Sequence, residues 1–527
     1  MSINSAAFLL FLAVSVAAYY LLPKKRRYLV LLSASAYFYL AYSLRAACYL
    51  LFTILTTYAA ARWMGAMHRQ ERTALAAEGA DRPAVKRQGK RRRHLVLAGI
   101  LVLNFSTLAL FKYLDAWLGS VNGLLGLLGA SLQFRPLELL LPLGISFYIF
   151  QTSGYLIDVC RGRAEPERNL LKYALFASYF PQMIQGPINR WDKLQPQLTE
   201  GNDFSADQLK YGIQLMLWGM LKKVFIADPL SAAVAEVYDN FTQYSGAVVF
   251  LGAALYCLQL YCDFSGGTDL VRGASQLFGV EMAENFRRPY FARSVDEFWR
   301  RWHISLGEWM KDYLFYPLAL SGPLNRLGKK ARKVFGVRIG KLTVPCAATV
   351  VVFLAVGVWQ GPGMSNIAYG LWNGGLMSLA MLCQPLFVRA NERLGLSEEK
   401  RWFRAFQVLR TCLLVVIGRY FSRSSSLMQA LRMLKRTLLH FGWSALGADT
   451  FTCFGLTGLH WLRLGLAAGV LLFVSVLQER GVPIRKTLEQ KHWSLQFAVL
   501  FAAVLLLVAF VYLNTDYTAI MYVYENV

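Results

Sequence analysis

The sequence predicts an all-helical protein that crosses a membrane many times, on the basis of its apolar content, its charge and the lengths of its apolar segments. Hydrophobic residues make up 56% of the 527-residue chain and charged residues 17%, against about 25% charged residues in an average soluble domain. Lys and Arg nevertheless outnumber Asp and Glu by 56 to 31, which gives a formal net charge of +25. A nucleic-acid-binding protein would explain only the charge, whereas a membrane protein with basic loops explains both properties.

The first apolar segment covers residues 6–22 and is followed by the basic cluster of residues 24–27. A cleavable signal peptide carries its charges before the apolar segment, so we interpret residues 6–22 as a membrane span with an extracytoplasmic N-terminus. We expect about eleven or twelve spans of roughly 17–25 residues, together with re-entrant or interfacial helices. Further apolar segments cover residues 28–42, 47–64, 95–112, 137–157, 169–184, 211–227, 246–262, 343–359, 364–385, 407–421, 463–478 and 494–513.

Two long basic segments, at about residues 67–94 and 322–342, are expected to be cytoplasmic loops, because positive charge collects on that side of a membrane. They either attract an anionic substrate to this side or only set the orientation of the chain. No linker or internal repeat divides the sequence, so we expect a single membrane domain over residues 1–527.

Metal and nucleic-acid sites are not expected. The eight cysteines are scattered without a CxxC pair, and the six histidines show neither HxxxH nor HExxH spacing. Aromatic residues are sparse in the basic segments, which favours membrane lipid headgroups over nucleic acid as their partners.

Polar residues cluster within the apolar surroundings of residues 261–317, and such residues are seldom kept in a membrane protein without a function. Ser294 and Glu297 have capping-box spacing, which predicts a helix beginning at Val295. Apolar residues at three- and four-residue steps continue this helix to position 313, with His303 beside the apolar stripe and Gly307 one turn further on. His303 is either a reactive imidazole or an interfacial histidine hydrogen-bonded to a carbonyl group.

Asp263 and Ser265 directly follow an apolar segment. They belong either to a functional site or to an interfacial loop in which Asp263 or Asp269 caps the next helix.

Several ordered motifs resemble those of the membrane-bound O-acyltransferases. Residues 298–306 (FWRRWHISL), with Trp309 and Asp312 after them, resemble the family signature, and residues 261–266 (YCDFSG) resemble a second block. Residues 141–151 and 181–190 (PQMIQGPINR) resemble two earlier blocks, and the similarity extends over nearly the whole chain. The most similar branches are the bacterial alginate O-acetyltransferase membrane subunit and the D-alanyl transfer protein of teichoic acid synthesis.

The resemblance implies an enzyme of the cell (inner or plasma) membrane, with helices around a central tunnel. An acyl group, preferably acetyl and alternatively D-alanyl, would pass from a cytoplasmic thioester to a hydroxyl of an extracytoplasmic polysaccharide, a wall polymer or a partner protein. The thioester, acetyl-CoA or an acyl carrier protein, would be a co-substrate rather than a bound cofactor, and a membrane-anchored extracytoplasmic protein would be the partner. The resemblance implies catalytic roles for His303 and Gln360, and substrate or tunnel roles for Asn373, Asp263, Ser265, Gln185, Arg190, Trp302, Trp359 and Asp312.

Two amides depart from the family pattern. The family's Trp-His-Gly block is Trp359-Gln360-Gly361 here, and a companion histidine is replaced by Asn373. An amide does not accept a proton at accessible pH. Three interpretations follow: His303 is the base and Gln360 orients a substrate; the proton leaves through water or a partner with reduced activity; or the chain is a non-catalytic scaffold or carrier in polymer modification.

Overall fold

The computed structural model describes residues 5–522, apart from residues 80, 130–131, 138, 140, 398, 444–446, 448–453, 514–519 and 521. Within these ranges the chain is all-helical, as predicted, and no strand occurs beyond one isolated antiparallel bridge between Phe286 and Trp302. The chain divides into two compact units. Unit 1 comprises residues 1–216, 270–283 and 524–527, and unit 2 comprises residues 217–269 and 284–523.

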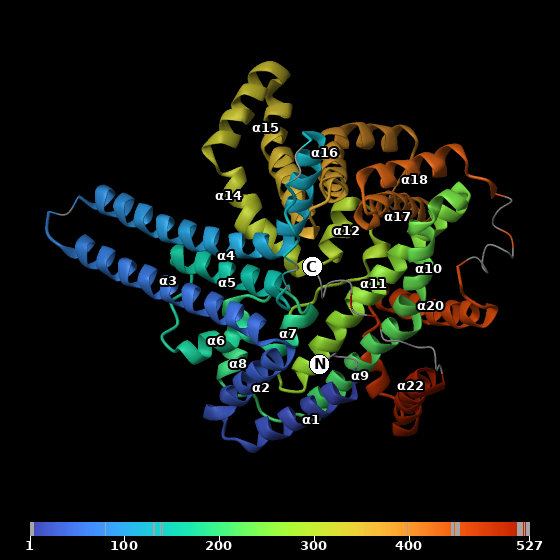
Figure 1. Ribbon diagram of the computed structural model, residues 1–527, viewed down its shortest axis with the longest axis horizontal. Coiled ribbons are helices and arrows are strands. Elements are labelled where there is room, and N and C mark those ends of the chain that lie inside the picture. Colours follow the sequence, from blue (N-terminus) through green and yellow to red (C-terminus); the bar gives the residue numbers. More distant parts are fainter. Residues whose placement is uncertain are drawn as a thin grey trace. The chain divides into compact units, whose positions relative to one another are not determined.

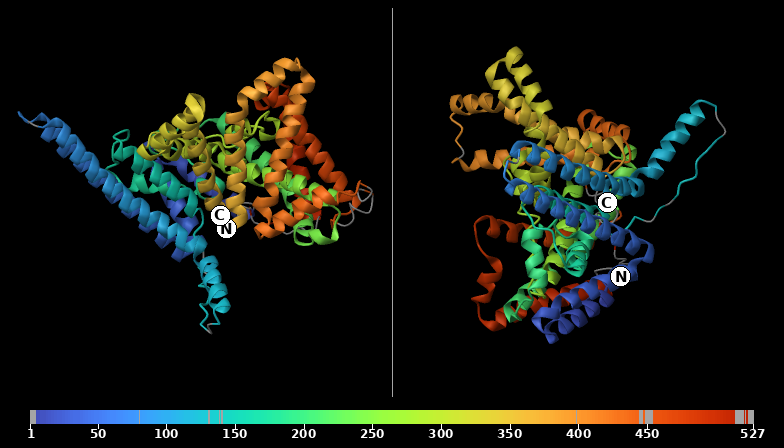
Figure 2. Two further views of the ribbon diagram at one scale, coloured as in Figure 1. Left: turned by 90° about the horizontal axis from the view of Figure 1, so that it is seen from above. Right: turned by 90° about the vertical axis from the view of Figure 1, so that its left-hand side faces the viewer.

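Unit 1 is built around the long helices α3 and α4, which run side by side as a hairpin (Figures 1 and 2). Helix α5 packs against both, and α2 packs against α3 and α6. The helices of this unit are α1 (Ala6–Leu21), α2 (Arg27–Tyr42), α3 (Leu44–Ala76), α4 (Arg82–Leu127), α5 (Ile145–Cys160), α6 (Leu170–Ser178), α7 (Phe180–Gln185) and α8 (Trp191–Thr199).

Unit 2 contains a second helical hairpin, formed by α15 and α16, with α17 packed against α16 and α18 against α17. Its helices are α10 (Asp228–Asp239), α12 (Val295–Arg301), α13 (Ile304–Met310), α14 (Tyr316–Ala319), α15 (Gly322–Gln360), α16 (Met364–Arg393), α17 (Arg401–Arg423), α18 (Leu427–Leu439), α20 (Gly458–Glu479), α21 (Ile484–Glu489) and α22 (Trp493–Leu513). Helices α9 (Ala206–Lys222) and α11 (Gly246–Gln276) contribute residues to both units.

The two basic segments, expected to connect membrane spans, are mainly helical. Residues 67–94 extend α3 and α4 beyond their apolar parts, and residues 322–342 form the start of α15. Helix α15 folds back on itself at Gly336, whose φ of 85° is accessible to glycine at little cost. Lys, Arg, Ala and Gln have high helix propensity, so these charged extensions stay helical.

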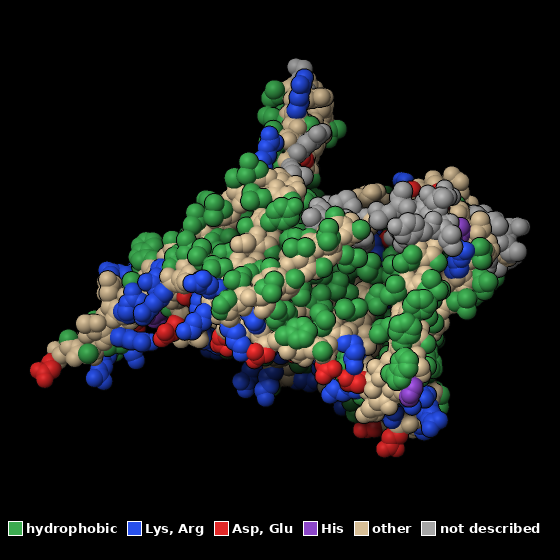
Figure 3. Space-filling model, turned by 90° about the horizontal axis from the view of Figure 1, so that it is seen from below, with side chains coloured by type: hydrophobic (Ala, Val, Ile, Leu, Met, Phe, Trp, Pro, Cys, Tyr) green, Lys and Arg blue, Asp and Glu red, His purple; other side chains and the backbone are tan. Residues whose placement is uncertain are grey.

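Eight described helices are long and apolar enough to cross a membrane: α3, α4, α11, α15, α16, α17, α20 and residues 493–510 of α22. The shorter helix α1 is also apolar. Two of the segments expected to be spans form short helices. Helices α2 and α5 have 16 residues each and reach about 24 Å, less than the roughly 30 Å hydrocarbon core. Hydrophobic side chains cover much of the surface in view in Figure 3, as contact with lipid requires.

Candidate active site

The helix predicted from Val295 to position 313 is interrupted at Trp302 and His303. Its predicted start is confirmed, because the Ser294 side chain accepts a hydrogen bond from the Glu297 backbone N–H at 3.1 Å. However, α12 ends at Arg301 and α13 begins at Ile304, and His303 between them has φ 48° and ψ 53°. The prediction that His303 lies on the border of an apolar helix face is therefore wrong: the side chain is buried, with 2% exposed.

A short backbone pairing holds this break in place. The Arg287 N–H donates to the Arg301 carbonyl at 2.9 Å, and the Ile304 N–H donates to the Asn285 carbonyl at 3.0 Å. A left-handed backbone conformation at a residue other than glycine is unfavourable and persists only where its surroundings enforce it. Strain of this kind is common in active sites.

Asn285 fixes the tautomer of the neutral His303 ring. Its Oδ1 accepts from the Ser305 backbone N–H at 3.1 Å and the Ser305 hydroxyl at 2.9 Å, and it lies 3.1 Å from His303 Nδ1. Because a backbone N–H can only donate, the shared atom must be an oxygen, and Nδ1 must carry the proton that points to it. In the neutral imidazole the basic lone pair is therefore on Nε2.

Aromatic rings surround this imidazole. The Phe264 ring meets it edge-on with a centroid distance of 4.8 Å, and the Trp359 ring lies 6.0 Å away. Trp302 turns the other way and stacks on Phe298 at 5.5 Å. Burial lowers the pKa of His303 to about 3, because an apolar site disfavours the charged form, so the ring is neutral at pH 7.

Asp263 and Ser265 contact lysines rather than capping a helix. Both lie inside α11, so the interfacial-loop interpretation is wrong. Asp263 pairs with Lys223 at 2.6 Å, and Lys223 also pairs with Asp228 at 2.9 Å. The Ser265 hydroxyl accepts from Lys222 at 2.9 Å.

Asp269 completes this buried cluster through a 2.7 Å salt bridge to Lys222. The lysines were missed as site residues, although a Lys222-Lys223 pair inside an apolar segment was a visible signal. Lys223 opens a π-helical turn, Lys223–Ala227, a feature frequent at functional sites.

The two amides that replace family histidines occupy different positions. Asn373, on α16, accepts from the Trp299 indole N–H at 3.1 Å and donates to the Tyr369 carbonyl at 2.8 Å. Its amide therefore anchors α12 to α16. Gln360 is the half-buried last residue of α15, directly after the Trp359 ring that faces His303.

Comparison with known proteins agrees with this geometry. A model of the membrane-bound O-acyltransferase family matches residues 165–334, a range that includes the buried lysine cluster and His303. The chain is 32% identical to the probable alginate O-acetylase AlgI of Pseudomonas aeruginosa over 92% of its own length and 83% of that protein. The chain belongs to the membrane-bound O-acyltransferase family.

Other relatives in the family act on different polymers. The chain is 30% identical to the peptidoglycan O-acetyltransferase of Helicobacter pylori, over 64% of this chain and 63% of that protein. It is 26% identical to the teichoic acid D-alanyltransferase of Bacillus subtilis, over 54% of this chain and 69% of that protein.

Two further family blocks meet within unit 1. Gln182 donates to Gln151 through a short contact, and Asn189 donates to the Gln182 side-chain oxygen at 3.2 Å. This buried amide network joins residues 141–151 to residues 181–190. Gln185 is the buried last residue of α7 and Arg190 the half-buried residue before α8, so these two predicted site residues belong to a different compact unit from His303.

Asp312, the remaining predicted residue of this O-acyltransferase-family site, lies in the half-buried π-helical turn Lys311–Phe315 that follows α13. In unit 2, the structure thus brings Trp359 and Phe264 of the α11 motif to the His303 ring, and adds Asn285, which sequence reasoning missed. Its only signal in the sequence was its place at the start of the motif-bearing segment.

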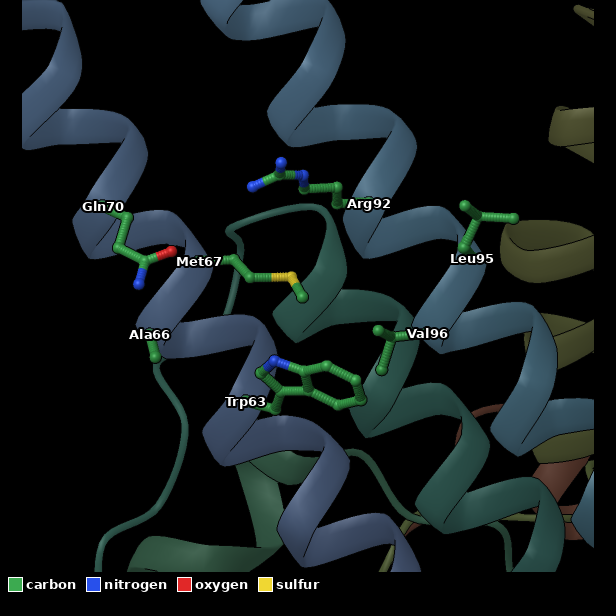
Figure 4. Close-up of a pocket in the computed structure, with 7 residues that line it drawn as sticks. All are labelled: Trp63, Ala66, Met67, Gln70, Arg92, Leu95 and Val96. Carbon is green, nitrogen blue, oxygen red and sulfur yellow. The ribbon is translucent and has the colours of Figure 1, made fainter.

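A separate hollow of about 420 Å³ lies between α3 and α4 (Figure 4). Trp63 and Met67 from α3 and Arg92 from α4 line it, together with Ala66, Gln70, Leu95 and Val96. None of the predicted site residues lines this hollow. It lies where the apolar parts of the two helices meet their basic extensions.

Proposed function

We propose that this chain is an active O-acyltransferase that moves an acetyl group from a cytoplasmic thioester to a hydroxyl of an extracytoplasmic polysaccharide. The observation that carries the proposal is the hydrogen bond from His303 Nδ1 to Asn285, which leaves Nε2 as the proton acceptor in a buried, neutral imidazole. Acetyl is proposed because the alginate O-acetylases are the relatives matched over most of the chain.

In the proposed reaction, Nε2 of His303 takes the proton of the acceptor hydroxyl while that oxygen attacks the thioester carbonyl carbon. A C–O bond forms and the C–S bond breaks. The imidazolium then gives the proton to the leaving thiolate, so the products are the ester and the free thiol. A hydroxyl is a weak nucleophile without such a base, whose contribution is typically 10²–10⁴-fold. Gln360 would orient the hydroxyl or donate a hydrogen bond to the carbonyl oxygen, since its amide does not take up a proton.

The acceptor and donor faces follow from the same proposal. We place the N-terminus outside the cytoplasm and the basic segments of α3–α4 and α15 inside, where they face acetyl-CoA or an acyl carrier protein. Gln185 and Arg190 in unit 1 and Asp312 in unit 2 would each have a substrate or tunnel role. A membrane-anchored extracytoplasmic protein would be the partner, and a hydroxyl of that protein is the alternative acceptor.

The replacement of the family histidine by Gln360 favours a second candidate function. If His303 does not supply the base on its own, the chain would be a scaffold or carrier for polymer modification. D-alanyl transfer to teichoic acid is the alternative reaction within the enzyme proposal.

The test is acyl transfer from radiolabelled acetyl-CoA, and separately from an acetylated carrier protein, to a polysaccharide acceptor. Wild type, His303→Ala and Gln360→His would be purified in lipid nanodiscs. We expect transfer by wild type and its loss in His303→Ala. Full activity of His303→Ala would rule out His303 as the base. The scaffold function would be favoured if the purified wild-type protein is inactive but deletion of its gene still abolishes polymer modification in cells.

A further inference from the structure

Arg419 is a buried positive charge whose guanidinium is not paired with an acid. It lies in α17, one of the helices apolar and long enough to span a membrane, and 2% of it is exposed. Lys222, Lys223 and Arg93 are buried too, but each pairs with a carboxylate. In the part of the chain that the structure describes, no carboxylate forms a salt bridge with Arg419; the groups facing it are Tyr369, Cys257, Tyr290 and Tyr256.

The guanidinium of Arg419 has few hydrogen-bond partners. Nη1 donates to the Tyr369 hydroxyl at 3.2 Å, and the Cys257 thiol, a weak acceptor, lies beside the guanidinium. Nε and Nη2 are both buried, and neither forms a hydrogen bond of ordinary distance and angle with a described residue. Nε and Nη2 form the side edge of the guanidinium, whose two parallel N–H groups match the two oxygens of a carboxylate or phosphate. Buried donors without partners are rare in native structures and call for an explanation.

The surroundings connect this edge to the candidate base. The guanidinium carbon lies 5.0 Å from the centre of the Trp302 ring and 5.9 Å from that of Tyr369. Trp302 directly precedes His303 in the interrupted helix. Interactions with aromatic faces offset only part of the free-energy cost of burying a cation, so an anion beside the guanidinium would offset the rest. An ionisable residue within a membrane span is most often functional.

We propose that the Nε–Nη2 edge of Arg419 binds an anionic group of a substrate, a carboxylate or a phosphate, beside the Trp302–His303 turn. The assignment to a substrate rests on the proposed O-acyltransferase function. The anion has two possible sources with the same chemistry, an acidic sugar of the acceptor or a phosphate of the thioester donor.

The test is equilibrium binding to the full chain in lipid nanodiscs, with no turnover. The probes are free CoA, a uronic acid oligosaccharide and a neutral oligosaccharide of equal length. We expect one anionic probe to bind wild type, and its affinity to fall about 10- to 100-fold in Arg419→Gln, the range expected for hydrogen bonds to a charged group. The probe whose affinity falls identifies the source of the anion.

Arg423→Gln is the matched control, because Arg423 is one turn further along α17, is half-buried and lies over the Tyr238 ring. It should bind the probes as wild type does. Arg419→Lys keeps the buried charge but loses the two parallel N–H groups of the Nε–Nη2 edge, so it should bind the anionic probe more weakly than wild type. It tests the proposal if Arg419→Gln does not fold. Equal binding by wild type and the folded Arg419 variants, or no binding of either anionic probe to wild type, would overturn the proposal.

The same assay separates this inference from the proposed function. Loss of transfer in His303→Gln with unchanged probe binding leaves both proposals standing. A wild type that binds the anionic probe through Arg419 but transfers no acyl group would contradict only the proposed function.

Discussion

Nδ1 of His303 lies 3.1 Å from Oδ1 of Asn285, and this contact determines which ring nitrogen is basic. The Asn285 oxygen is identified by the Ser305 N–H that it also accepts. The same asparagine offers its backbone carbonyl to Ile304 at the start of α13. Asn285 thus sets both the tautomer of the imidazole and the backbone break that presents it, which makes it the positioning residue for His303.

Replacing Asn285 should impair transfer through His303. In Asn285→Ala the imidazole loses the acceptor for its Nδ1 proton, and the ring can adopt the other tautomer or rotate. We expect kcat to fall about 10- to 100-fold, less than the 10²–10⁴-fold range for loss of the base itself. Single-turnover transfer from acetyl-CoA by the folded variant measures this change.

Asn285→Asp and Ser305→Ala are the controls. Aspartate still accepts the Nδ1 proton, so Asn285→Asp should retain much more activity than Asn285→Ala. Ser305→Ala removes only one donor to the shared oxygen and should change kcat less than three-fold, roughly one ordinary hydrogen bond or less. Equal losses in all three variants would show that the residue supports packing alone.

Gln360 should orient a substrate rather than exchange a proton. We expect Gln360→Ala to lower kcat about 10-fold, the effect of one lost hydrogen bond to a reacting group, and Gln360→His to raise it by no more than a few-fold. Initial rates at saturating donor test both variants. An inactive wild type that Gln360→His makes active would instead show that the family histidine position carries the proton transfer.

Acidification should destabilise the protein through His303. The folded pKa of about 3 lies below the value of 6.5 for a free imidazole, so between these values the unfolded chain binds a proton that the folded chain does not. Stability is therefore lost as pH falls below about 6.5, by up to about 1.4 kcal/mol per pH unit for this group. Thermal unfolding in detergent between pH 5 and 7.5 measures the slope.

His303→Gln should flatten this pH dependence, whereas His492→Gln should not, because His492 is exposed. A slope that is identical in wild type and His303→Gln would mean that another group is responsible.

The sequence was sufficient for the helical membrane fold and the family, because apolar segment length and ordered motifs are local signals. It was not sufficient for the break at His303, since apolar residues continue at helical spacing through Trp302 and only the pairing with residues 285–287 interrupts them. The partners of Asp263 and the surroundings of Arg419 were missed for the same reason. Lys223 is 40 positions from Asp263 in the chain, and no local pattern indicates that the two meet.

Charge on the α3–α4 extension should govern capture of an anionic thioester donor. Reversing Lys90, Arg91 and Arg92 to Glu should raise the KM for acetyl-CoA about 10-fold at low salt and reduce its salt dependence, because screened attraction weakens as ionic strength rises. The measurement is the KM for the donor from 20 to 300 mM salt. An unchanged KM would mean that these residues only set the orientation of the chain in the membrane.

The control for this prediction reverses three exposed cations outside the basic segments, Arg480, Lys486 and Lys491. This variant has the same change in net charge, so it should keep the wild-type KM if the effect belongs to the α3–α4 extension. Equal effects in both variants would indicate a general effect of net charge.

The salt bridge between Asp263 and Lys223 should be a structural support for the site rather than a contact with substrate. Asp263→Asn leaves the buried ammonium with only Asp228 as a charged partner, and breaking a buried pair typically costs about 3–5 kcal/mol. Asp269→Asn should cost less, because its carboxylate is 17% exposed and is partly solvated already. Thermal unfolding and acyl transfer should therefore decline together in Asp263→Asn, since Phe264 next to it packs against His303. An Asp263→Asn variant that melts like wild type but has lost transfer would show instead that this carboxylate acts on the substrate.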